Sequence, residues 1–315
     1  MTARVPAKVN LQLSVGPPRA DGYHDLVTVF HALALFDEVT VTPAETDSVR
    51  VSGEGAASVP LGPDNLAARA VAALTDAAGA GCRDEPGVAI EIRKRIPVAA
   101  GLAGGSADAA AALVACNELW GTGLSHQELA EVAGRVGSDV AFALLGGTAI
   151  GLGRGEQVTP ALVSGTYHWV LAFAAEQLST AAVYAACDRL RSADDSQPPA
   201  AAPWAAPGLS TELMAALRSG DPAQVGPLLV NDLQPAAISL LPRLRQALAA
   251  GREHGALGAI VSGSGPTCAY LARDGKHARD LAVALTSMGV CRSVVSVTGP
   301  APGATVLSPA ADRRR

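Results

Sequence analysis

The sequence predicts an α+β protein of two domains. Its 315 residues are about twice the usual length of a single domain. Segments in which apolar and polar residues alternate, typical of strands, are interleaved with segments of helical spacing. The composition, 49% hydrophobic and 17% charged, is that of a globular protein with a large core. Because only 3% of the residues are aromatic, we expect that core to consist mainly of Ala, Val and Leu.

Charge and cysteine usage exclude several classes of protein. The 24 Lys and Arg against 29 Asp and Glu leave a net charge of −5, which argues against a nucleic-acid-binding surface. The five cysteines are scattered and form no Cys-x-x-Cys pair, so we expect reduced thiols and no structural zinc. The N-terminus lacks the apolar core of a signal peptide. These features together predict a cytoplasmic protein.

The N-terminal segment predicts a strand with one polar face. Apolar residues alternate with polar ones over 5–15, which places Lys8, Asn10 and Gln12 together on the second face. Such a face is usually the solvated side of an edge strand, but it can also carry a site. A Pro- and Gly-containing turn over 17–22 then presents Tyr23 and His24. Further strands are predicted over 26–33, 39–42 and 49–52.

The stretch over 96–109 is the most informative part of the chain. A predicted strand over 88–92 precedes it, and the Ala-rich helix over 109–115 follows, with Ser106 placed like a helix N-cap. Glycines let a backbone approach a ligand closely, and amide N–H groups at a helix start attract anions. A tight turn that leads into a buried helix has the same pattern. The stretch alone therefore does not distinguish an anion-binding loop from such a turn. The spacing fits neither a Walker P-loop nor a Rossmann fingerprint.

The rest of the first half alternates helices with turns. Asn65 precedes a predicted helix over 66–78 and suits a cap, and Ser125 with Glu128 forms a capping box for the next helix. Asp139 precedes an apolar run over 140–145, where an N-cap is again the ordinary role. A strand is predicted over 148–152.

The second half repeats this mixture. Strands are expected over 169–174, 259–261, 268–271 and 294–297, and helices from Ser179-Thr180, over 240–254 and over 277–288. Tyr184 on the first of these helices is by its pattern a core residue. The Pro-, Ala-, Ser- and Asp-rich segment 192–208 predicts an exposed loop, and the composition of 299–315 predicts a disordered tail.

Three separated stretches resemble the motifs of the GHMP kinase superfamily. They are Pro6-Ala7-Lys8-Val9-Asn10-Leu11, the loop from Pro97 to Ala109, and Gly263-Ser264-Gly265-Pro266. Further marks resemble the branch that phosphorylates a cytidine-diphosphate-linked methylerythritol. These marks are Arg19-Ala20-Asp21-Gly22-Tyr23-His24, Gly101-Leu102-Ala103-Gly104-Gly105-Ser106 and Gly137-Ser138-Asp139-Val140. The resemblance covers about residues 4–298.

The resemblance implies a two-domain GHMP kinase fold with the active site in the inter-domain cleft. Residues 1–160 would form the N-terminal ATP-binding domain and 161–298 the C-terminal domain, and the disordered tail 299–315 would lie outside both. The implied cofactors are ATP and Mg²⁺, the implied partner is the small-molecule substrate, and no nucleic acid or membrane is involved. The sequence leaves a monomer and a homodimer equally open, and it indicates no protein ligands for the metal.

The resemblance also implies roles for individual residues. Lys8 and Asp139 match the catalytic pair, in which Asp139 would accept or orient the proton of the attacking hydroxyl and Lys8 would keep Asp139 ionised. The ATP-binding positions are Asn65, Pro97, Ala99, Ala100, Gly101, Leu102, Ala103, Gly104, Gly105, Ser106 and Ala107. The substrate-binding positions are Asn10, Tyr23, His24, Thr180 and Tyr184. The two tyrosines would stack on cytosine from both sides.

Some positions depart from the family pattern. Ala107 lacks a hydroxyl often found there, Ala181 replaces a proline of some relatives, and Asp108 has to point away from ATP. Two alternatives remain at this point: another GHMP kinase acting on mevalonate, homoserine or a sugar, or a non-catalytic nucleotide-binding regulator. The pair Tyr23 and Tyr184 favours a nucleobase substrate, and retention of both Lys8 and Asp139 favours catalysis.

Overall fold

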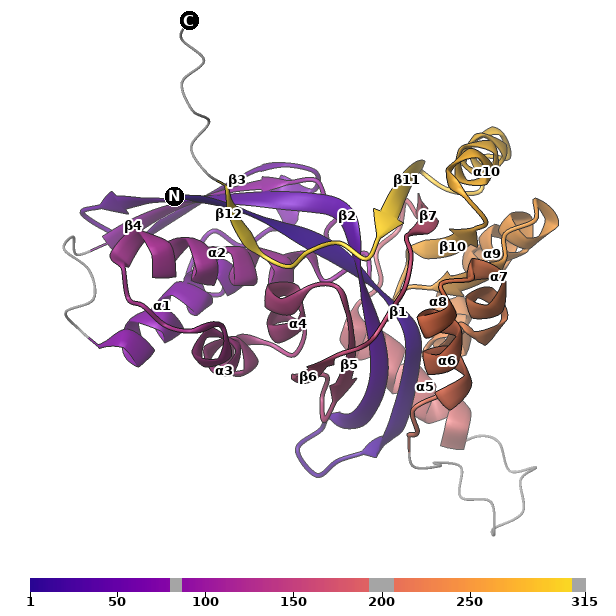
Figure 1. The fold of residues 1–315 in the computed structure, drawn as a ribbon, viewed down its shortest axis with the longest axis horizontal. Coiled ribbons are helices and arrows are strands. Elements are labelled where there is room, and N and C mark those ends of the chain that lie inside the picture. Colours follow the sequence, from indigo (N-terminus) through magenta and orange to yellow (C-terminus); the bar gives the residue numbers. More distant parts are fainter. Residues whose placement is uncertain (80–86, 193–206, 308–315) are drawn as a thin grey trace, which may run out of the picture.

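The chain folds into two lobes that lie side by side, as Figure 1 shows. The structure, a computed structural model, describes residues 1–79, 87–192 and 207–307. One lobe contains a large sheet with the N-terminal helices, and the other contains a smaller sheet with the C-terminal helices. Mixed helices and sheets in two lobes confirm the predicted α+β class.

The large sheet is built around two long antiparallel strands, β1 and β2. Its strands in the described residues are β1 (Thr2–Pro18), β2 (His24–Ala44), β3 (Ser48–Gly53), β4 (Gly87–Lys94), β5 (Thr148–Leu152), β6 (Gln157–Pro160), β8 (Val230–Asn231) and β12 (Thr305–Leu307). The main order is β12-β1-β2-β4-β3. β2 joins the strands predicted separately over 26–33 and 39–42. Its pairing with β1 continues through a register shift between Pro6 and Ala7, so the extra residues of β2 do not end the strand.

Among the residues that the structure describes, four helices pack on one side of this sheet: α1 (Leu66–Ala78), α2 (Gly104–Trp120), α3 (His126–Val136) and α4 (Val140–Leu145). α3 begins with the capping box expected from Ser125 and Glu128. α2 buries an unbroken alanine run, Ala109 to Ala112, whose small side chains let it pack closely between α1 and β2. The core of this lobe is built mostly from Ala, Val, Leu and Ile, in line with the scarcity of aromatics.

The second lobe is an antiparallel sheet in the order β11-β7-β10-β9 with helices packed on it. Its strands are β7 (Tyr167–Phe173), β9 (Gly258–Val261), β10 (Cys268–Ala272) and β11 (Ser293–Gly299). Its helices are α5 (Thr180–Ser192), α6 (Thr211–Ser219), α7 (Pro222–Val225), α8 (Gln234–Leu240), α9 (Arg243–Glu253) and α10 (Gly275–Ser287). Leu13 and Val15 of β1 belong to this second core, so β1 joins the two lobes.

One predicted helix begins later in the structure than predicted. The leucine spacing predicts a single helix over 240–254, but α8 ends at Leu240 and α9 begins only at Arg243. The reason is Pro242, because the residue before a proline is sterically driven out of the helical region. Leu241 accordingly has φ −135° and ψ 82°. The sequence patterns do not predict α6, α7, α8, β6, β8 or β12.

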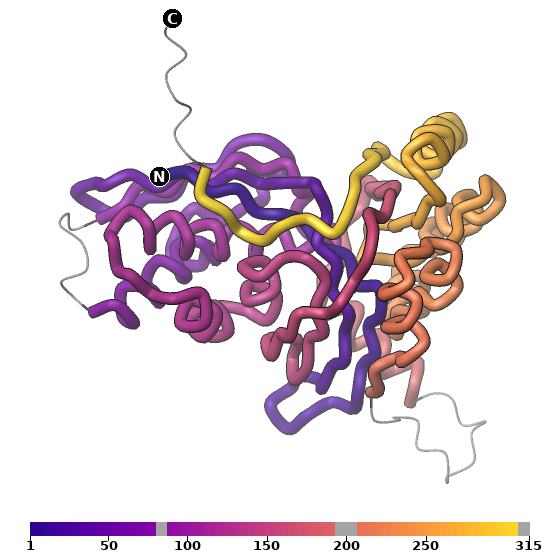
Figure 2. Tube along the Cα trace, in the orientation of Figure 1, coloured from indigo at the N-terminus to yellow at the C-terminus, as the bar shows by residue number. Residues whose placement is uncertain are grey.

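The prediction of a disordered tail over 299–315 is wrong for residues 299–307. This segment returns to the first lobe, where β12 pairs antiparallel with β1; Figure 2 traces its path. Ala301 and Ala304 are buried, and their N–H groups donate to the carbonyls of Ala32 (3.0 Å) and Ala143 (2.9 Å). A Pro-, Gly- and Ala-rich composition does not reveal such docking, because main-chain hydrogen bonds carry most of it. Residues 308–315, and most of the loop predicted over 192–208, lie outside the described residues.

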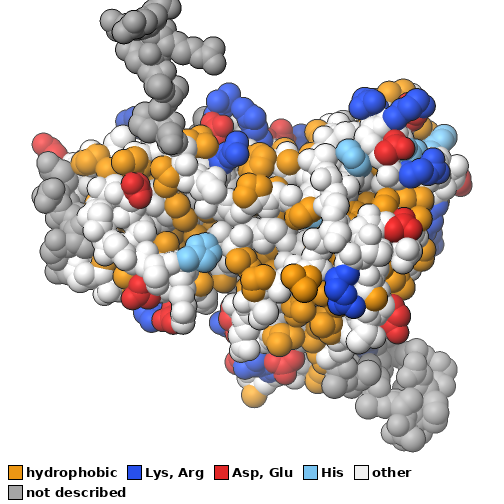
Figure 3. Space-filling view, in the orientation of Figure 1, with side chains coloured by type: hydrophobic (Ala, Val, Ile, Leu, Met, Phe, Trp, Pro, Cys, Tyr) orange, Lys and Arg blue, Asp and Glu red, His pale blue; other side chains and the backbone are white. Residues whose placement is uncertain are grey.

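The surface in Figure 3 carries acidic and basic side chains interspersed with apolar ones. Over residues 1–79, 87–192 and 207–307, no helix has both the length and the apolar character that crossing a bilayer requires.

Candidate active site

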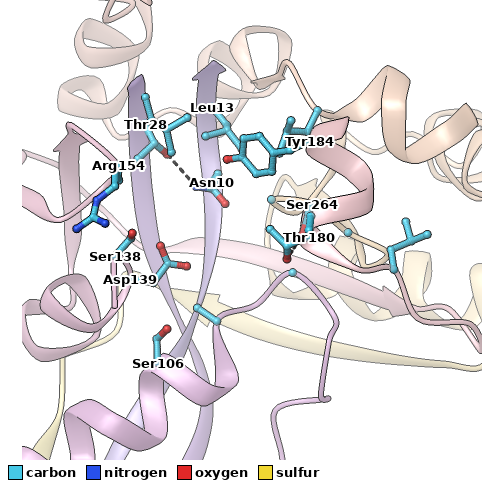
Figure 4. A pocket seen from close by; sticks show the side chains of 18 of the residues that line it. Asn10, Leu13, Thr28, Ser106, Ser138, Asp139, Arg154, Thr180, Tyr184 and Ser264 are labelled. Carbon is cyan, nitrogen blue, oxygen red and sulfur yellow. Dashed lines mark hydrogen bonds between the residues drawn. The ribbon is translucent and has the colours of Figure 1, made fainter. Parts of the chain in front are cut away.

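A cleft of about 890 Å³ collects most of the residues that the sequence analysis singles out. It is lined by β1 and β2, by the glycine loop that leads into α2, by the start of α4, by α5 and by the loop after β9. Figure 4 shows side chains from these elements facing the same space. Segments far apart in the sequence therefore meet at one site.

Lys8 lies at the centre of this cleft and is almost completely buried. Its Nζ donates to Asn10 Oδ1 at 2.7 Å and to the Gly101 carbonyl at 3.1 Å, and lies 3.7 Å from Asp139 Oδ2. Burial lowers the pKa of Lys8, and the negative charge of Asp139 opposes that shift. The polar face of β1 is thus part of a site and not a solvated surface.

A chain of hydrogen bonds holds Asn10 in place. Its Nδ2 donates to Thr28 Oγ1 at 2.8 Å, the bond drawn in Figure 4, and the Thr28 hydroxyl donates to the Gln12 carbonyl at 2.7 Å. This arrangement turns the Asn10 carbonyl oxygen toward Lys8. The ammonium group is therefore kept in one position before any ligand binds, which favours electrostatic preorganisation.

Asp139 stands at the N-cap position of α4, but it does not act as a cap. Its backbone is helical (φ −88°, ψ −5°), and its carboxylate accepts no capping hydrogen bond. The side chain is 28% exposed and lines the cleft opposite Lys8. The carboxylate is thus available to a ligand in the cleft.

The glycine loop forms a cradle of alternating backbone conformations. Ala99, Gly101 and Ala103 all have positive φ (52°, 76° and 59°), and α2 begins at Gly104. The expected N-cap role of Ser106 is therefore wrong, because Ser106 lies inside the first turn and Ala103 occupies the cap position without a side-chain bond. Ser106 instead lines the cleft, at the end of α2 where unpaired N–H groups and the helix dipole favour an anion.

The three motifs of the sequence analysis meet at Gly101. The carbonyl of this residue accepts hydrogen bonds from Lys8 Nζ (3.1 Å) and from Ser262 Oγ (3.0 Å). A Cβ on Gly101 would lie 2.1 Å from the Ser262 carbonyl oxygen, so no other residue fits without moving the backbone. The loop after β9 is also joined to the glycine loop by a bond from Thr267 N to the Ala100 carbonyl at 3.4 Å.

We expect Gly101→Ala to lower kcat/KM for the phosphoryl transfer that the resemblance implies roughly 100-fold, because displacement of a positioning group by about 1 Å costs that much. Gly123→Ala is the matched control: Gly123 also has positive φ (70°), but it faces open space. Initial rates of both variants at subsaturating nucleotide make the comparison. Equal activity of the two variants would contradict the close approach at Gly101.

Tyr184 and His24 form the opposite wall of the cleft. Their ring centroids are 5.0 Å apart at 37°, and His24 Nε2 is bonded to Asp188 Oδ1 at 2.9 Å, which fixes the orientation of the imidazole. Burial raises the pKa of the Tyr184 hydroxyl, so the phenol stays neutral. Tyr23 is 53% exposed and faces Arg154, whose Cζ lies 5.0 Å from the ring centroid. Both tyrosines thus line the cleft, although the expected sandwich remains a prediction.

α5 presents a row of side chains to the cleft. Thr180, Tyr184 and Asp188 are spaced four residues apart and share one face of the helix. Thr180 Oγ1 is 3.0 Å from Ser264 Oγ, so α5 is tied directly to the third motif. The sequence analysis misses Asp188, although its spacing from Tyr184 would have revealed it. It also misses Arg154 and Ser264 as cleft residues, for which the sequence offers only neighbouring motif residues.

Four expected ATP-binding residues do not line the cleft: Asn65, Pro97, Leu102 and Ala107. Asn65 caps α1 instead, since its Oδ1 accepts from Ala67 N (2.9 Å) and its Nδ2 donates to the Pro60 carbonyl (2.8 Å). The side chains of Leu102 and Ala107 are buried in the core because they point away from the cradle. Pro97 lines a separate depression behind the loop. The other twelve residues expected to contact ATP or substrate, with both catalytic residues, lie in the cleft, and their roles stay predictions.

A buried ionic cluster supports the glycine loop from below. Lys94 Nζ donates to Asp37 Oδ2 at 2.5 Å and to Asp108 Oδ2 at 2.7 Å, and all three residues are at most 3% exposed. Asp37 Oδ1 also accepts from the N–H groups of Arg95 (2.5 Å) and Ile96 (2.9 Å), where the chain enters the loop. Asp108 points away from the cleft, as expected, and burial raises its pKa to about 8.

Two family descriptions match this chain. Residues 65–147 match "GHMP kinases N terminal domain" and residues 213–291 match "GHMP kinases C terminal". The 4-diphosphocytidyl-2-C-methyl-D-erythritol kinase of Thermobifida fusca is 53% identical over 98% of this chain and 98% of its own length. The chain belongs to the GHMP kinase family. The enzyme of the same description from Mycolicibacterium gilvum is 53% identical over 98% of this chain and 92% of the relative.

Solved structures agree with this assignment. The crystal structure of a 4-(cytidine 5'-diphospho)-2C-methyl-D-erythritol kinase superposes on this GHMP kinase with a TM-score of 0.73, at 33% identity over 95% of this chain and 98% of that one. The homoserine kinase of Cytophaga hutchinsonii, 19% identical over 98% of this chain and 97% of that one, has a TM-score of 0.71 and shares the fold. Family membership implies the use of ATP. Within the described ranges, no group of three or more His, Cys, Asp or Glu side chains could hold a metal ion alone.

Proposed function

We propose that this protein transfers the γ-phosphate of ATP to the C2 hydroxyl of 4-diphosphocytidyl-2-C-methyl-D-erythritol, giving the 2-phosphate and ADP for non-mevalonate isoprenoid biosynthesis. The observation that carries the proposal is the placement of Lys8 and Asp139 between the glycine loop and the pocket of His24 and Tyr184. One cleft thus combines an anion cradle, a cation–carboxylate pair and an aromatic wall. In this proposal residues 1–160 are the ATP-binding domain and 161–298 the second domain, and the enzyme is cytoplasmic.

In the proposed reaction, Asp139 acts on the acceptor hydroxyl. The C2 oxygen forms the new bond to the γ-phosphorus while the bond from the γ-phosphorus to the bridging oxygen of ADP breaks. The hydroxyl proton passes to the Asp139 carboxylate, for which general-base catalysis contributes about 10²–10⁴-fold. Lys8 keeps that carboxylate ionised and offsets negative charge on the transferring group. A loose phosphoryl transition state depends mainly on such positioning and electrostatics.

The glycine loop is proposed to hold the triphosphate. Backbone N–H groups from Gly101 to Ser106 line the cleft at the start of α2 and suit phosphate oxygens. Mg²⁺ prefers oxygen ligands and usually takes one or two from protein while phosphates supply others. The Ser106 hydroxyl and the Asp139 carboxylate both line this cleft, so the oxygen donors present fit that ion. When bound, Mg²⁺ would neutralise phosphate charge.

The second half of the cleft is proposed to bind cytosine. Tyr184 offers a neutral aromatic face, and the tie between His24 and Asp188 presents the imidazole in a fixed orientation toward the base edge. Tyr23 provides a second, exposed face. Mevalonate, homoserine and galactose carry no nucleobase, so a wall of this kind would not help to bind them. This distinction separates the proposal from other GHMP kinase activities.

The deciding experiment measures ADP release with Mg-ATP and 4-diphosphocytidyl-2-C-methyl-D-erythritol, with mevalonate, homoserine and galactose in parallel. We expect turnover with the cytidine compound alone. Turnover with another acceptor would retain the kinase activity and reject the cytosine pocket. Binding of ATP without turnover of any of the four acceptors would favour a nucleotide-binding regulator.

We expect His24→Ala to raise the KM for the cytidine substrate about 10-fold or more, because loss of a hydrogen bond to a polar substrate group costs on the order of 1–3 kcal/mol. The KM for ATP should not change. His126→Ala, an exposed position at the start of α3, is the control. Steady-state kinetics with each substrate varied in turn give both constants, and an unchanged KM for the cytidine substrate would remove the base-reading role of His24.

A further inference from the structure

Arg154 is a cationic residue in the cleft to which neither the sequence motifs nor the proposed chemistry assigns a role. It lies in the turn between β5 and β6, where its N–H donates to Glu156 Oε2 at 2.6 Å. Its guanidinium carbon is 5.0 Å from the centroid of the Tyr23 ring. Arg154 lines the cleft, and in Figure 4 its side chain lies at the edge of the view, above Ser138 and near Asp139. The residue therefore lies close both to Tyr23 and to the segment that carries Asp139.

Arg154 differs from Lys8, the other cation of the cleft, in having no carboxylate partner among the described residues. Among the described residues that line the cleft, the lysine and arginine side chains are those of Lys8 and Arg154, and the carboxylates are Asp139 and Asp188. Lys8 is engaged by Asn10, Gly101 and Asp139. In the ranges that the structure describes, no carboxylate forms an ion pair with Arg154, and its guanidinium contact is the Tyr23 ring. The guanidinium N–H groups are thus not committed to a carboxylate within the described part of the chain.

The surrounding backbone holds the Arg154 turn against the catalytic segment. Arg154 stands between Gly153 and Gly155, both with positive φ (70° and 103°), which gives the turn its sharp shape. The position of a Cβ on Gly155 is 3.9 Å from Ser138 Cβ, the residue before Asp139. The Tyr23 ring supports one side of the guanidinium, and the bond to Glu156 fixes the backbone from which it projects. The cation is therefore pre-positioned, which reduces the entropy lost on binding.

We propose that Arg154 binds the diphosphate group of the substrate between the nucleobase pocket and the phosphoryl-accepting hydroxyl. The inference rests on the proposed function, in which a cytidine diphosphate ester enters the cleft. A planar guanidinium matches phosphate oxygens with two parallel N–H···O bonds and remains charged at every relevant pH. Without it, a dianionic group would pass between two carboxylates with no cation on the side of the base.

The position of Arg154 favours the substrate diphosphate over the triphosphate of ATP. The ATP phosphates are assigned to the backbone from Gly101 to Ser106 at the start of α2. Arg154 instead contacts Tyr23, on the nucleobase side of the cleft. The two phosphate groups thus have separate partners: backbone N–H groups and a helix dipole for one, and a side-chain guanidinium for the other. This separation makes the proposal testable with fragments of the substrate.

The test is a ligand and variant cycle measured by isothermal titration calorimetry. Cytidine and cytidine diphosphate are titrated into the wild-type protein, Arg154→Gln and Arg154→Lys. Arg19→Gln is the control, because Arg19 precedes the same pocket but is paired with Asp21 and Asp25 outside the cleft. We expect the wild-type protein and the control to bind the diphosphate about 10- to 100-fold more tightly than cytidine. Arg154→Gln should abolish most of this preference, and Arg154→Lys should retain part of it.

Kinetics provide the second readout. Arg154→Gln should raise the KM for the full substrate by the same factor and leave the KM for ATP unchanged. Arg154→Gln binding cytidine diphosphate with the same preference over cytidine as the wild-type protein would overturn the proposal. The proposal would also be overturned if Arg154→Gln weakened binding of a non-hydrolysable ATP analogue instead of binding of the diphosphate. If the wild-type protein bound neither cytidine nor its diphosphate, the nucleobase pocket of the proposed function would itself be rejected. That result differs from a failure of Arg154 alone, in which both ligands bind but the preference persists.

Discussion

Asp139→Asn is expected to lower kcat by about 10²–10⁴-fold, equivalent to about 3–5 kcal/mol in the activation barrier. The amide keeps the shape of the side chain but cannot accept the hydroxyl proton. Because Asp139 forms no capping bond in α4, its loss should not disturb the helix. Single-turnover measurements with ATP and the cytidine substrate give the rate of the chemical step directly.

The same variant should still bind nucleotide. Its affinity for ADP, measured by calorimetry, is expected to stay within about threefold of the wild-type value, because the phosphates are assigned to the glycine loop. Asp280→Asn serves as the control, since this carboxylate is exposed on α10 and paired with Lys276. A rate for Asp139→Asn equal to that of the control would exclude Asp139 as the base.

Lys94→Met is expected to destabilise the protein by about 3–5 kcal/mol. Removal of one partner from a buried ion cluster leaves unpaired charges in a medium of low dielectric constant. Here the loss would leave the buried Asp37 carboxylate without its cationic partner, beside the buried Asp108. Chemical unfolding followed by circular dichroism at neutral pH measures the change. A free energy of unfolding within 1 kcal/mol of wild type would contradict the role given to the cluster.

Asp108→Asn is the matched variant for this cluster. We expect it to stabilise the folded protein at alkaline pH, which is the opposite of the effect of Lys94→Met. Burial raises the pKa of Asp108 to about 8 in the folded protein, above the ordinary value of 3.8. A raised carboxyl pKa favours the folded state while the group is protonated, and this contribution is lost as the pH rises from about 4 to 8. The neutral amide removes that loss, so the variant should gain stability relative to wild type as the pH rises from about 4 to 8, with no further gain above that.

Short-range patterns determined much of what could be predicted. The helix over 66–78 and the strand over 148–152 have the bounds predicted for them, and α3 begins with its capping box. These elements depend on side-chain alternation, helix spacing and caps, which act within a few residues. The three motif stretches also sufficed to predict the family and the fold class. All of this information is local or is carried by the order of the motifs.

Other features depended on contacts between distant segments. The sequence left open whether Lys8 is solvated and whether Asp139 is only a cap. The first was decided by Gly101, whose carbonyl is brought against Lys8 of β1 and the loop after β9 by tertiary packing. The second was decided by the helical backbone of Asp139, whose side chain forms no capping bond and lies 3.7 Å from Lys8. For Asn65 the structure favours the helix-cap role. Its side-chain oxygen caps α1 and its side-chain nitrogen bonds the Pro60 carbonyl, so both ends of the amide are used.

The sequence by itself therefore determined many of the elements, the family and part of the cleft lining. The tertiary structure decided which of those residues face one another, where Arg154 enters the cleft, and that residues 299–307 pair with the first sheet. The physical reason is that periodicity and capping report energies within one segment. Burial of Lys8, the clash that would exclude a Cβ at Gly101 and the pairing of β12 with β1 arise only when separate segments are brought together.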